Sequence, residues 1–201
     1  MSVDVSALPE GVWWLLAAAI GYLLGAINPA ALISRALGVN LQSVGSGNPG
    51  ATNVARAVGP RWAVLVGFLD ILKGFLPAFV FGVLIGQTAG QVAGLAAVIG
   101  HITSPYLRGR GGKGVATTLG AILGVQPLLA VPVLMAFGIG VAIWHRVGIG
   151  AVVGALVLIA AGIVGWAVGW TDAADMWFAI LLGLLVLGRH AGNIRRAFSG
   201  R

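Results

Sequence analysis

The sequence lacks cysteine and is poor in charged residues. With no Cys among its 201 residues, it can form neither disulfide bonds nor thiolate metal sites. Only 12 Lys or Arg and 5 Asp or Glu are present, 8% of the chain, against roughly 25% in an average soluble domain. That is too little charge to cover a water-facing surface, which excludes a soluble enzyme, a disordered tail and a fibrous protein. With 59% hydrophobic residues, the composition predicts an integral membrane protein with several spans.

The N-terminal segment also lacks basic residues. It carries Asp4 and Glu10 but no early Lys or Arg, so it has no positive start of a signal peptide, and we expect the first apolar run to remain in the mature protein. The net charge of +7 comes from small basic groups between apolar runs, which is typical of loops that orient membrane helices. Without a basic stripe interleaved with aromatic residues, nucleic-acid binding is not indicated.

Apolar runs and short polar segments alternate along the chain. The first uncharged run, 11–34, reaches roughly 36 Å as a helix, which exceeds the ~30 Å hydrocarbon core. A Gly-, Asn- and Ser-rich loop with one short helix, Ala51–Val58, follows. The further predicted spans are 62–86, 89–102, the two halves of 114–145 on either side of Pro127, 147–171, and a last run from Met176 to Arg189.

The basic residues predict the orientation of these seven helices. Seven crossings put the termini on opposite sides, and with the N-terminus outside, the inner segments are 35–61, 104–114, 145–147 and the C-terminal tail. Eleven of the 12 Lys and Arg residues fall there, Lys73 being the exception, as the positive-inside rule requires. We therefore expect an all-α polytopic membrane protein, one domain over residues 1–201, with a cytoplasmic C-terminus. Five spans with re-entrant segments would also put the two termini on opposite sides of the membrane.

The first motif is the glycine-rich run Gly45–Asn53, followed by Arg56. Glycines let a backbone approach a ligand and offer it free N–H groups, and the short helix that follows adds its first amides. The motif therefore favours anion binding; a solvated loop that caps a helix is the alternative. Its G-x-G-x-x-G spacing does not indicate a dinucleotide site, because that fingerprint requires a preceding strand and here a membrane span precedes it.

The second motif, Arg108–Thr118, is another glycine-rich turn before a helix and carries three cations. Lys113 is followed by Gly rather than Ser or Thr, so a P-loop is not indicated. A positive-inside anchor would explain the cations but not the glycines, and we interpret the turn as a second anion-binding element.

The third motif is Arg189–Arg196, in which His190 and Asn193 are three residues apart and share a helical face. His101 ends an earlier span at the same predicted side. Either histidine is suited to relay protons near neutral pH, whereas His145 is interpreted as an ordinary turn residue. Inside the second span, Asp70 and Lys73 form either a simple ion pair or part of the site, because unpaired charges at that depth are costly.

Taken together in this order, the segments Gly45–Asn53 with Arg56, Leu69–Gly74, Gly111–Thr117, and His190 with Asn193 resemble the bacterial acyl-phosphate:glycerol-3-phosphate acyltransferase family, PlsY. The resemblance covers nearly the whole chain. It implies a seven-span, N-out enzyme of the bacterial inner membrane whose site faces the cytoplasm. The chain departs from the family pattern at Gly25–Pro29 and at Gly148 and Gly150, where the family usually has Ser-containing stretches.

The resemblance also implies the reaction: a fatty acyl group passes from acyl phosphate to the 1-hydroxyl of sn-glycerol 3-phosphate, which gives lysophosphatidic acid and phosphate. No coenzyme A, acyl carrier protein, metal or other cofactor is expected. Expected partners are the bilayer and the soluble phosphate acyltransferase that supplies acyl phosphate. The expected catalytic residues are Ser46, Arg56, Lys113, His190 and Asn193. The expected substrate-binding residues are Gly45, Gly47, Asn48, Gly50, Thr52, Asn53, Gly111, Gly112, Gly114, Thr117, His101, Asp70 and Lys73.

Other classes of protein remain open at this stage. A carrier for small anions would suit the glycine-rich spans, but carriers usually bind their ligand at the midplane, and here the polar motifs gather at one face. A metal-dependent lipid phosphotransferase needs clustered carboxylates, which the spans lack. A purely structural membrane subunit would give no reason for three motifs suited to anions.

Overall fold

The computed structural model describes residues 9–198, with side chains described as far as Gly192. Within this range the chain forms helices and turns and no strand. The elements, in order, are α1 Glu10–Ala26, α2 Pro29–Ala36, η2 Leu41–Ser43, α3 Ala51–Ala57, α4 Pro60–Leu84, α5 Gln87–Thr103, η3 Pro105–Leu107, α6 Val115–Val125, α7 Pro127–Trp144, α8 Val147–Ala167 and α9 Ala173–Phe198.

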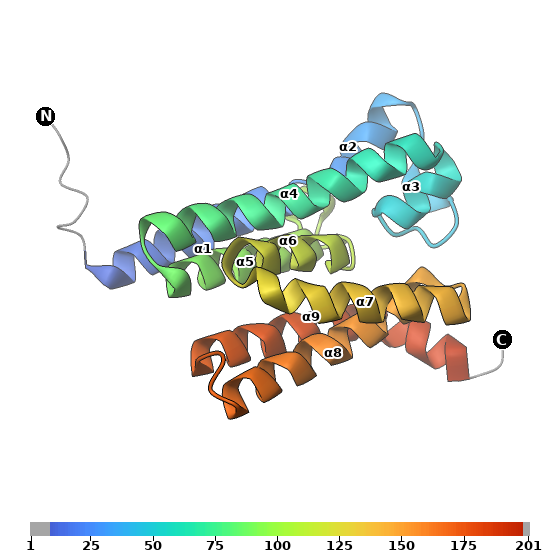
Figure 1. Cartoon of the computed structure of the whole chain (residues 1–201). Coiled ribbons are helices and arrows are strands. Elements are labelled where there is room, and N and C mark those ends of the chain that lie inside the picture. The colour runs from blue at the N-terminus through green and yellow to red at the C-terminus, as the bar shows by residue number, and fades with distance from the viewer. Residues whose placement is uncertain (1–8, 199–201) are drawn as a thin grey trace, which may run out of the picture.

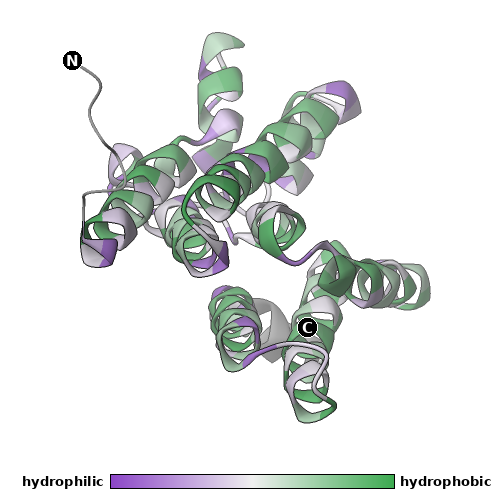
Figure 2. Cartoon of the chain, turned by 60° about the vertical axis from the view of Figure 1, so that its left-hand side comes forward, coloured by the Kyte–Doolittle hydropathy of each residue, from purple (hydrophilic) through white to green (hydrophobic). Residues whose placement is uncertain are grey.

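The longest helices are long and apolar enough to cross a membrane. Five stretches meet this description: Glu10–Ala36, Pro60–Leu84, Pro127–Trp144, Val147–Ala167 and Ala173–Gly192. Helix α6, with 11 residues, is apolar but shorter, and α5 has 17 residues. Hydrophobic residues run along the long helices in Figure 2. The all-helical fold is thus confirmed over the described residues, with five stretches suited to cross a membrane, while seven crossings and an outside N-terminus stay predictions.

The helices form two groups (Figure 1). Helices α1, α4, α5 and α6 pack together in one group, and α7, α8 and α9 in the other. A buried cluster that includes Val98, Ile122, Leu129, Leu158 and Leu182 joins the two. Helix α1 begins at one end of the bundle and α9 ends at the other. The loops around α2 and α3, the loop before α6 and the α7–α8 turn all lie at the end where α9 finishes.

Small residues bring the helix backbones into close contact, as the glycine content predicts. A Cβ added at Gly25 of α1 would collide with the backbone of Ala97 in α5, and one at Gly120 of α6 with the carbonyl of Ile71 in α4. Without a hydrophobic driving force between helices in lipid, such close packing is what holds them together.

The first apolar run contains a break that the sequence analysis did not anticipate. Helix α1 ends at Ala26, and α2 begins at Pro29 after Asn28. The Asn28 side chain caps α2 by accepting a hydrogen bond from the Ala31 N–H at 2.8 Å, and proline fits the first helical position because it has no N–H to satisfy. Two other predictions are confirmed: a short helix near 51–58 is α3, and Pro127 begins a new helix, α7.

Candidate active site

The first glycine-rich loop is organised around a buried asparagine. Asn53, only 1% exposed, donates from Nδ2 to the carbonyls of Leu41 and Val44 at 3.1 and 3.0 Å, and its Oδ1 accepts from the Ser46 N–H at 3.4 Å. Gly45 has a φ of +54°, and a Cβ there would lie 2.6 Å from Asn53 Oδ1. The turn therefore requires glycine at this position and is held in one conformation by Asn53.

The second glycine-rich loop is fixed against the end of α5 and against α9. The N–H groups of Gly111 and Gly112 donate to the carbonyls of Ile102 and His101, both at 3.1 Å. Arg189 of α9 donates to the carbonyls of the same two glycines at 3.2 and 3.3 Å. A Cβ on Gly112 would overlap the His101 imidazole, so the loop can lie over this ring only because it lacks a side chain there.

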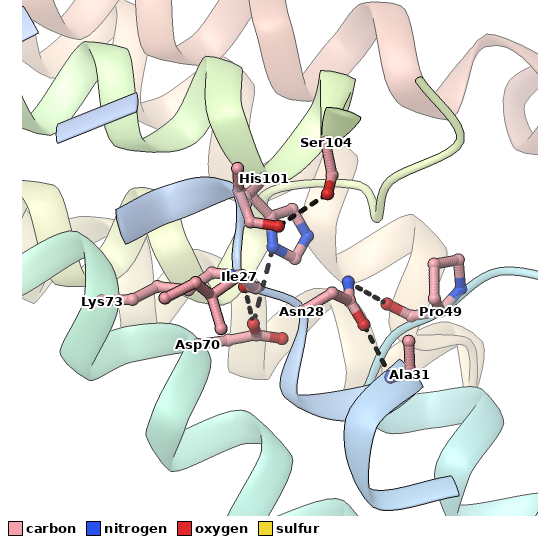
Figure 3. A network of polar contacts seen from close by, with 9 residues as sticks. Ile27, Asn28, Ala31, Pro49, Asp70, Lys73, His101 and Ser104 are labelled. Atoms are coloured by element: carbon pink, nitrogen blue, oxygen red, sulfur yellow. Dashed lines mark hydrogen bonds and ion pairs between the residues drawn. The ribbon is translucent and has the colours of Figure 1, made fainter. Parts of the chain in front are cut away.

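A buried polar network connects α4 to the break in the first span (Figure 3). Lys73 Nζ lies 2.9 Å from Asp70 Oδ1 and donates to the Ile27 carbonyl at 2.7 Å. His101 Nδ1 lies 3.5 Å from the same Asp70 oxygen. Ser104 Oγ donates to the Ala26 carbonyl at 2.6 Å. The backbone carbonyls left unpaired where α1 ends are thus satisfied by side chains from α4 and by the residue after α5.

Asn28 links this network to the first glycine-rich loop. Its Nδ2 donates to the Pro49 carbonyl at 3.1 Å, so the side chain that caps α2 also holds the glycine-rich turn. The break in the first span therefore places Asn28, which holds the glycine-rich loop, beside the buried Asp70–Lys73 pair.

His190 of α9 is 2% exposed, and its Nδ1 lies 2.8 Å from the Val186 carbonyl oxygen. A carbonyl oxygen only accepts hydrogen bonds, so this contact assigns the proton to Nδ1. In the neutral ring Nε2 then carries the lone pair and is free to accept a proton.

These elements meet around one cavity of about 600 Å³. Polar residues from both glycine-rich loops, α4, α5 and α9 line one part of it. Helices α6 to α9 supply an apolar wall that includes Leu119, Val133, Leu134, Phe137, Ala151, Ala155, Leu158 and Val186. The cavity therefore joins a cationic, hydrogen-bonding region to an apolar region.

The structure brings most of the sequence-predicted residues to this cavity and leaves some outside its lining. Those that line it are Ser46, Asn48, Gly50, Thr52, Asn53, Arg56, Asp70, His101, Lys113, Gly114 and His190. Gly45, Gly47, Gly111 and Gly112 shape the two loops without lining the cavity, and Lys73 lies behind Asp70. The side chain of Asn193 lies outside the described residues.

The cavity is lined by Thr118 rather than by the predicted Thr117, and by two residues that the sequence analysis did not assign to the site. Thr117 is fully buried, and its backbone packs against Gly74, whereas the neighbouring Thr118 lines the cavity. His145 and Arg146, which form the α7–α8 turn, also line the cavity, although His145 was interpreted as an ordinary turn residue. The signal in the sequence was Arg146 itself, a cation in a turn predicted to lie at the same face.

The chain is similar to known glycerol-3-phosphate acyltransferases. A family model described as glycerol-3-phosphate acyltransferase matches residues 15–200. Glycerol-3-phosphate acyltransferase from Aquifex aeolicus is 39% identical over 188 residues, 90% of this chain and 93% of that protein. Glycerol-3-phosphate acyltransferase 1 from Deinococcus radiodurans is 42% identical over 191 residues, 92% of each chain.

Two solved structures share the fold. Crystal structures of PlsY, an integral membrane glycerol 3-phosphate acyltransferase, in a glycerol 3-phosphate form and a lysophosphatidic acid form, superpose with TM-scores of 0.84 and 0.81. Both are 37% identical to this chain and cover 94% of it and 93% of their own length. The chain belongs to the PlsY family of integral membrane glycerol-3-phosphate acyltransferases.

Proposed function

We propose that this enzyme transfers a fatty acyl group from acyl phosphate to the 1-hydroxyl of sn-glycerol 3-phosphate, which yields lysophosphatidic acid and inorganic phosphate. The observation that carries the proposal is the single cavity in which two anion-suited loops adjoin an apolar wall between α7, α8 and α9. One substrate is small, anionic and water-soluble, and the other has a long chain. A cavity of this composition holds both head groups while the acyl chain lies against hydrophobic side chains.

The head groups are assigned to two sets of residues. The phosphoryl group of acyl phosphate is bound by the first loop, through Ser46, Asn48 and Thr52, with Lys113. Gly47 and Asn53 shape this loop instead, because their N–H groups donate to carbonyls within it. Glycerol 3-phosphate is bound by Arg56, Lys113, His190 and Asn193. The fixed fork of Arg56 suits a phosphate that must be oriented as well as bound.

The acyl group passes directly between the two substrates. The 1-hydroxyl oxygen attacks the carbonyl carbon, the bond from that carbon to the phosphate oxygen breaks, and phosphate leaves with the bonding electrons. The hydroxyl proton goes to His190 Nε2 or to a substrate phosphate oxygen. The tautomer set by Val186 supports His190 as acceptor, and positioning with charge stabilisation supplies the remaining catalysis.

Direct transfer is supported by the surroundings of Ser46. Among the described residues, Ser46 Oγ accepts a hydrogen bond from the Asn48 N–H at 3.4 Å and makes none with an imidazole, so no base activates it as a nucleophile. A labelled acyl group recovered on the protein after incubation with acyl phosphate alone would rule direct transfer out.

The cavity faces the cytoplasm in this proposal. The basic segments around 35–61, 104–114 and 145–147 lie at one end of the bundle, which is the end that the positive-inside rule puts in the cytoplasm. Seven crossings with an outside N-terminus satisfy that placement. The soluble phosphate acyltransferase that makes acyl phosphate would then deliver its product from the cytoplasmic side.

The donor distinguishes this function from its rivals. Purified enzyme given palmitoyl phosphate and glycerol 3-phosphate should form lysophosphatidic acid and phosphate one to one, and should form none when palmitoyl-CoA replaces palmitoyl phosphate. EDTA should leave the rate unchanged, which a metal-dependent phosphotransferase would not tolerate. Equal use of palmitoyl-CoA, or uptake of glycerol phosphate into liposomes without acyl transfer, would overturn the proposal.

A further inference from the structure

A second pocket, of about 420 Å³, lies at the same end of the molecule as the cavity of about 600 Å³ described above, which we call the reaction cavity. It is formed between α2, the segment after α2 and the loop before α6, and its lining includes Ser34, Arg35, Pro49, Leu107 and Arg110. None of these residues was assigned to either substrate above. The pocket therefore needs an explanation of its own.

The charge in this pocket is positive and unbalanced. Arg35 and Arg110 are the two charged residues in its lining, and neither forms an ion pair among the described residues. Both are exposed, so a ligand from solution or from the membrane surface can reach them. The C-terminal end of α2 favours a cation and accounts for Arg35, but it does not account for Arg110, which comes from a different loop.

A buried hydroxyl lies in the same lining. Ser34 is 1% exposed, and its Oγ has no hydrogen-bond partner among the described residues. Buried hydroxyl groups are normally paired because leaving one unpaired loses its hydration without compensation. A ligand oxygen in the pocket would supply the missing partner.

The second pocket is separate from the reaction cavity, although the same two loops build both. Pro49 lines the second pocket, while its neighbours Asn48 and Gly50 line the reaction cavity. Likewise, Arg110 lines the second pocket, and Lys113 lines the reaction cavity. Two of the three cations in the second sequence motif, Arg110 and Lys113, thus line different pockets.

We propose that this pocket is a second phosphate-binding site, in which Arg35 and Arg110 bind a phosphate group and Ser34 Oγ donates a hydrogen bond to it. Guanidinium groups suit phosphate because their planar N–H donors match its oxygens. The phosphate comes either from free inorganic phosphate or from the head group of an anionic lipid. The exposed Leu32 on α2 and Leu37 directly after it offer a lipid an apolar surface beside the pocket.

The test measures the reactivity of individual arginines with phenylglyoxal by mass spectrometry on the full-length enzyme. One arm adds inorganic phosphate to enzyme in neutral phosphatidylcholine nanodiscs. The other compares phosphatidylcholine discs with discs that contain phosphatidic acid, in phosphate-free buffer. When the ligand is at about ten times its dissociation constant, modification of Arg35 and Arg110 should slow roughly tenfold, because only the free fraction reacts.

Two exposed arginines outside both pockets, Arg61 and Arg108, are the controls, and their rates should not change. Protection by inorganic phosphate identifies the free anion as ligand, and protection only by phosphatidic acid identifies the lipid. Unprotected Arg35 and Arg110 in both arms, or equal slowing of all four arginines, would overturn the proposal.

The variant Ser34→Ala keeps both reporter arginines and should lose most of the protection; unchanged protection would remove Ser34 from the site. Protection of Arg56 in the same samples reports on the reaction cavity and on folding. Failure of the second site is therefore distinguishable from failure of the proposed reaction.

Discussion

At the scale of single residues, the proposed reaction depends on cations from two elements, Arg56 in α3 and Lys113 in the loop before α6. Arg56→Ala and Lys113→Ala should each lower kcat/KM at least about a hundredfold, which corresponds to about 2.7 kcal/mol of transition-state binding. Steady-state assays with palmitoyl phosphate measure this. Arg61→Ala removes an exposed cation that lines neither pocket and should keep the wild-type rate. Near-full activity of either cavity variant would remove that residue from the site.

Lys73 supports the site from behind rather than within it. Lys73→Met strands the buried Asp70 carboxylate and the Ile27 carbonyl, and breaking a buried ion pair costs about 3–5 kcal/mol. The thermal unfolding midpoint in detergent should therefore fall more for Lys73→Met than for the double variant Asp70→Asn/Lys73→Met, in which no buried charge is stranded. Additive losses across this double-mutant cycle would show that the two side chains do not interact.

The role of a residue could be predicted where the chemistry requires a particular type of side chain. It could not be predicted where it depends on which side of a helix faces the cavity. The two motifs that contain Arg56 and Lys113 could be identified from their glycines and cations alone. Thr117 and Thr118 could not be distinguished, because the cavity-facing side of α6 depends on how its glycines pack against α4. His145 adjoins the cavity only because the turn between α7 and α8 places it there, which no local pattern predicts.

At the scale of elements, helix packing rests on backbones in close contact. Gly25→Ala places a methyl group against the backbone of Ala97, and such overpacking costs about 1–3 kcal/mol. The unfolding midpoint of this variant should fall. Gly138→Ala in α7, where a Cβ meets nothing within 4 Å, is the matched control and should be neutral or gain about 0.5–1 kcal/mol. Equal behaviour of the two variants would contradict the close packing of α1 on α5.

A carboxylate joins three elements at the end of the bundle away from the reaction cavity. Asp175 of α9 is 3% exposed and accepts hydrogen bonds from the amides of Gln87, Gln91 and Gln126 at 2.7, 2.7 and 3.1 Å. Asp175→Ala leaves three amide donors unpaired and should destabilise the fold by about 3 kcal/mol. Asp175→Asn, which keeps one acceptor oxygen, should lose less.

Chemical denaturation in detergent measures both Asp175 variants. Glu10→Gln, which also removes an acid but at an exposed position, should change stability by less than about 0.5 kcal/mol. If all three variants unfold alike, the carboxylate does not hold these helices together.

Element boundaries followed from the sequence wherever proline or glycine marks them, as at Pro127 and at the start of α3. The break after Ala26 was missed because apolar residues continue on both sides of it, although Asn28 followed by Pro29 is a helix-start signal. Its cause lies in tertiary contacts, since Lys73 and Ser104 supply the hydrogen bonds that the interrupted helix gives up.

At the scale of the whole molecule, three motifs far apart in the sequence converge because the helices return their loops to one end of the bundle. Composition predicted the membrane class and the helical fold. It did not predict how α7, α8 and α9 stand apart from the other helices, because α7 and α8 are apolar on every face and their periodicity does not show which face packs against a neighbour. In the proposed function, the acyl chain lies against the apolar wall that these helices supply.

In the proposed function, the acyl donor lies with its head group at the glycine-rich loops and its chain against α7 and α8. A non-hydrolysable acyl phosphonate with a photoreactive diazirine on its chain tests this directly, with labelled peptides identified by mass spectrometry. We expect label on Val133–Phe137 and Ala151–Leu158, competition by palmitoyl phosphate, and loss of label in Arg56→Ala. Label spread over lipid-facing positions such as Leu15, Val83 and Val168, unaffected by the competitor, would contradict the account.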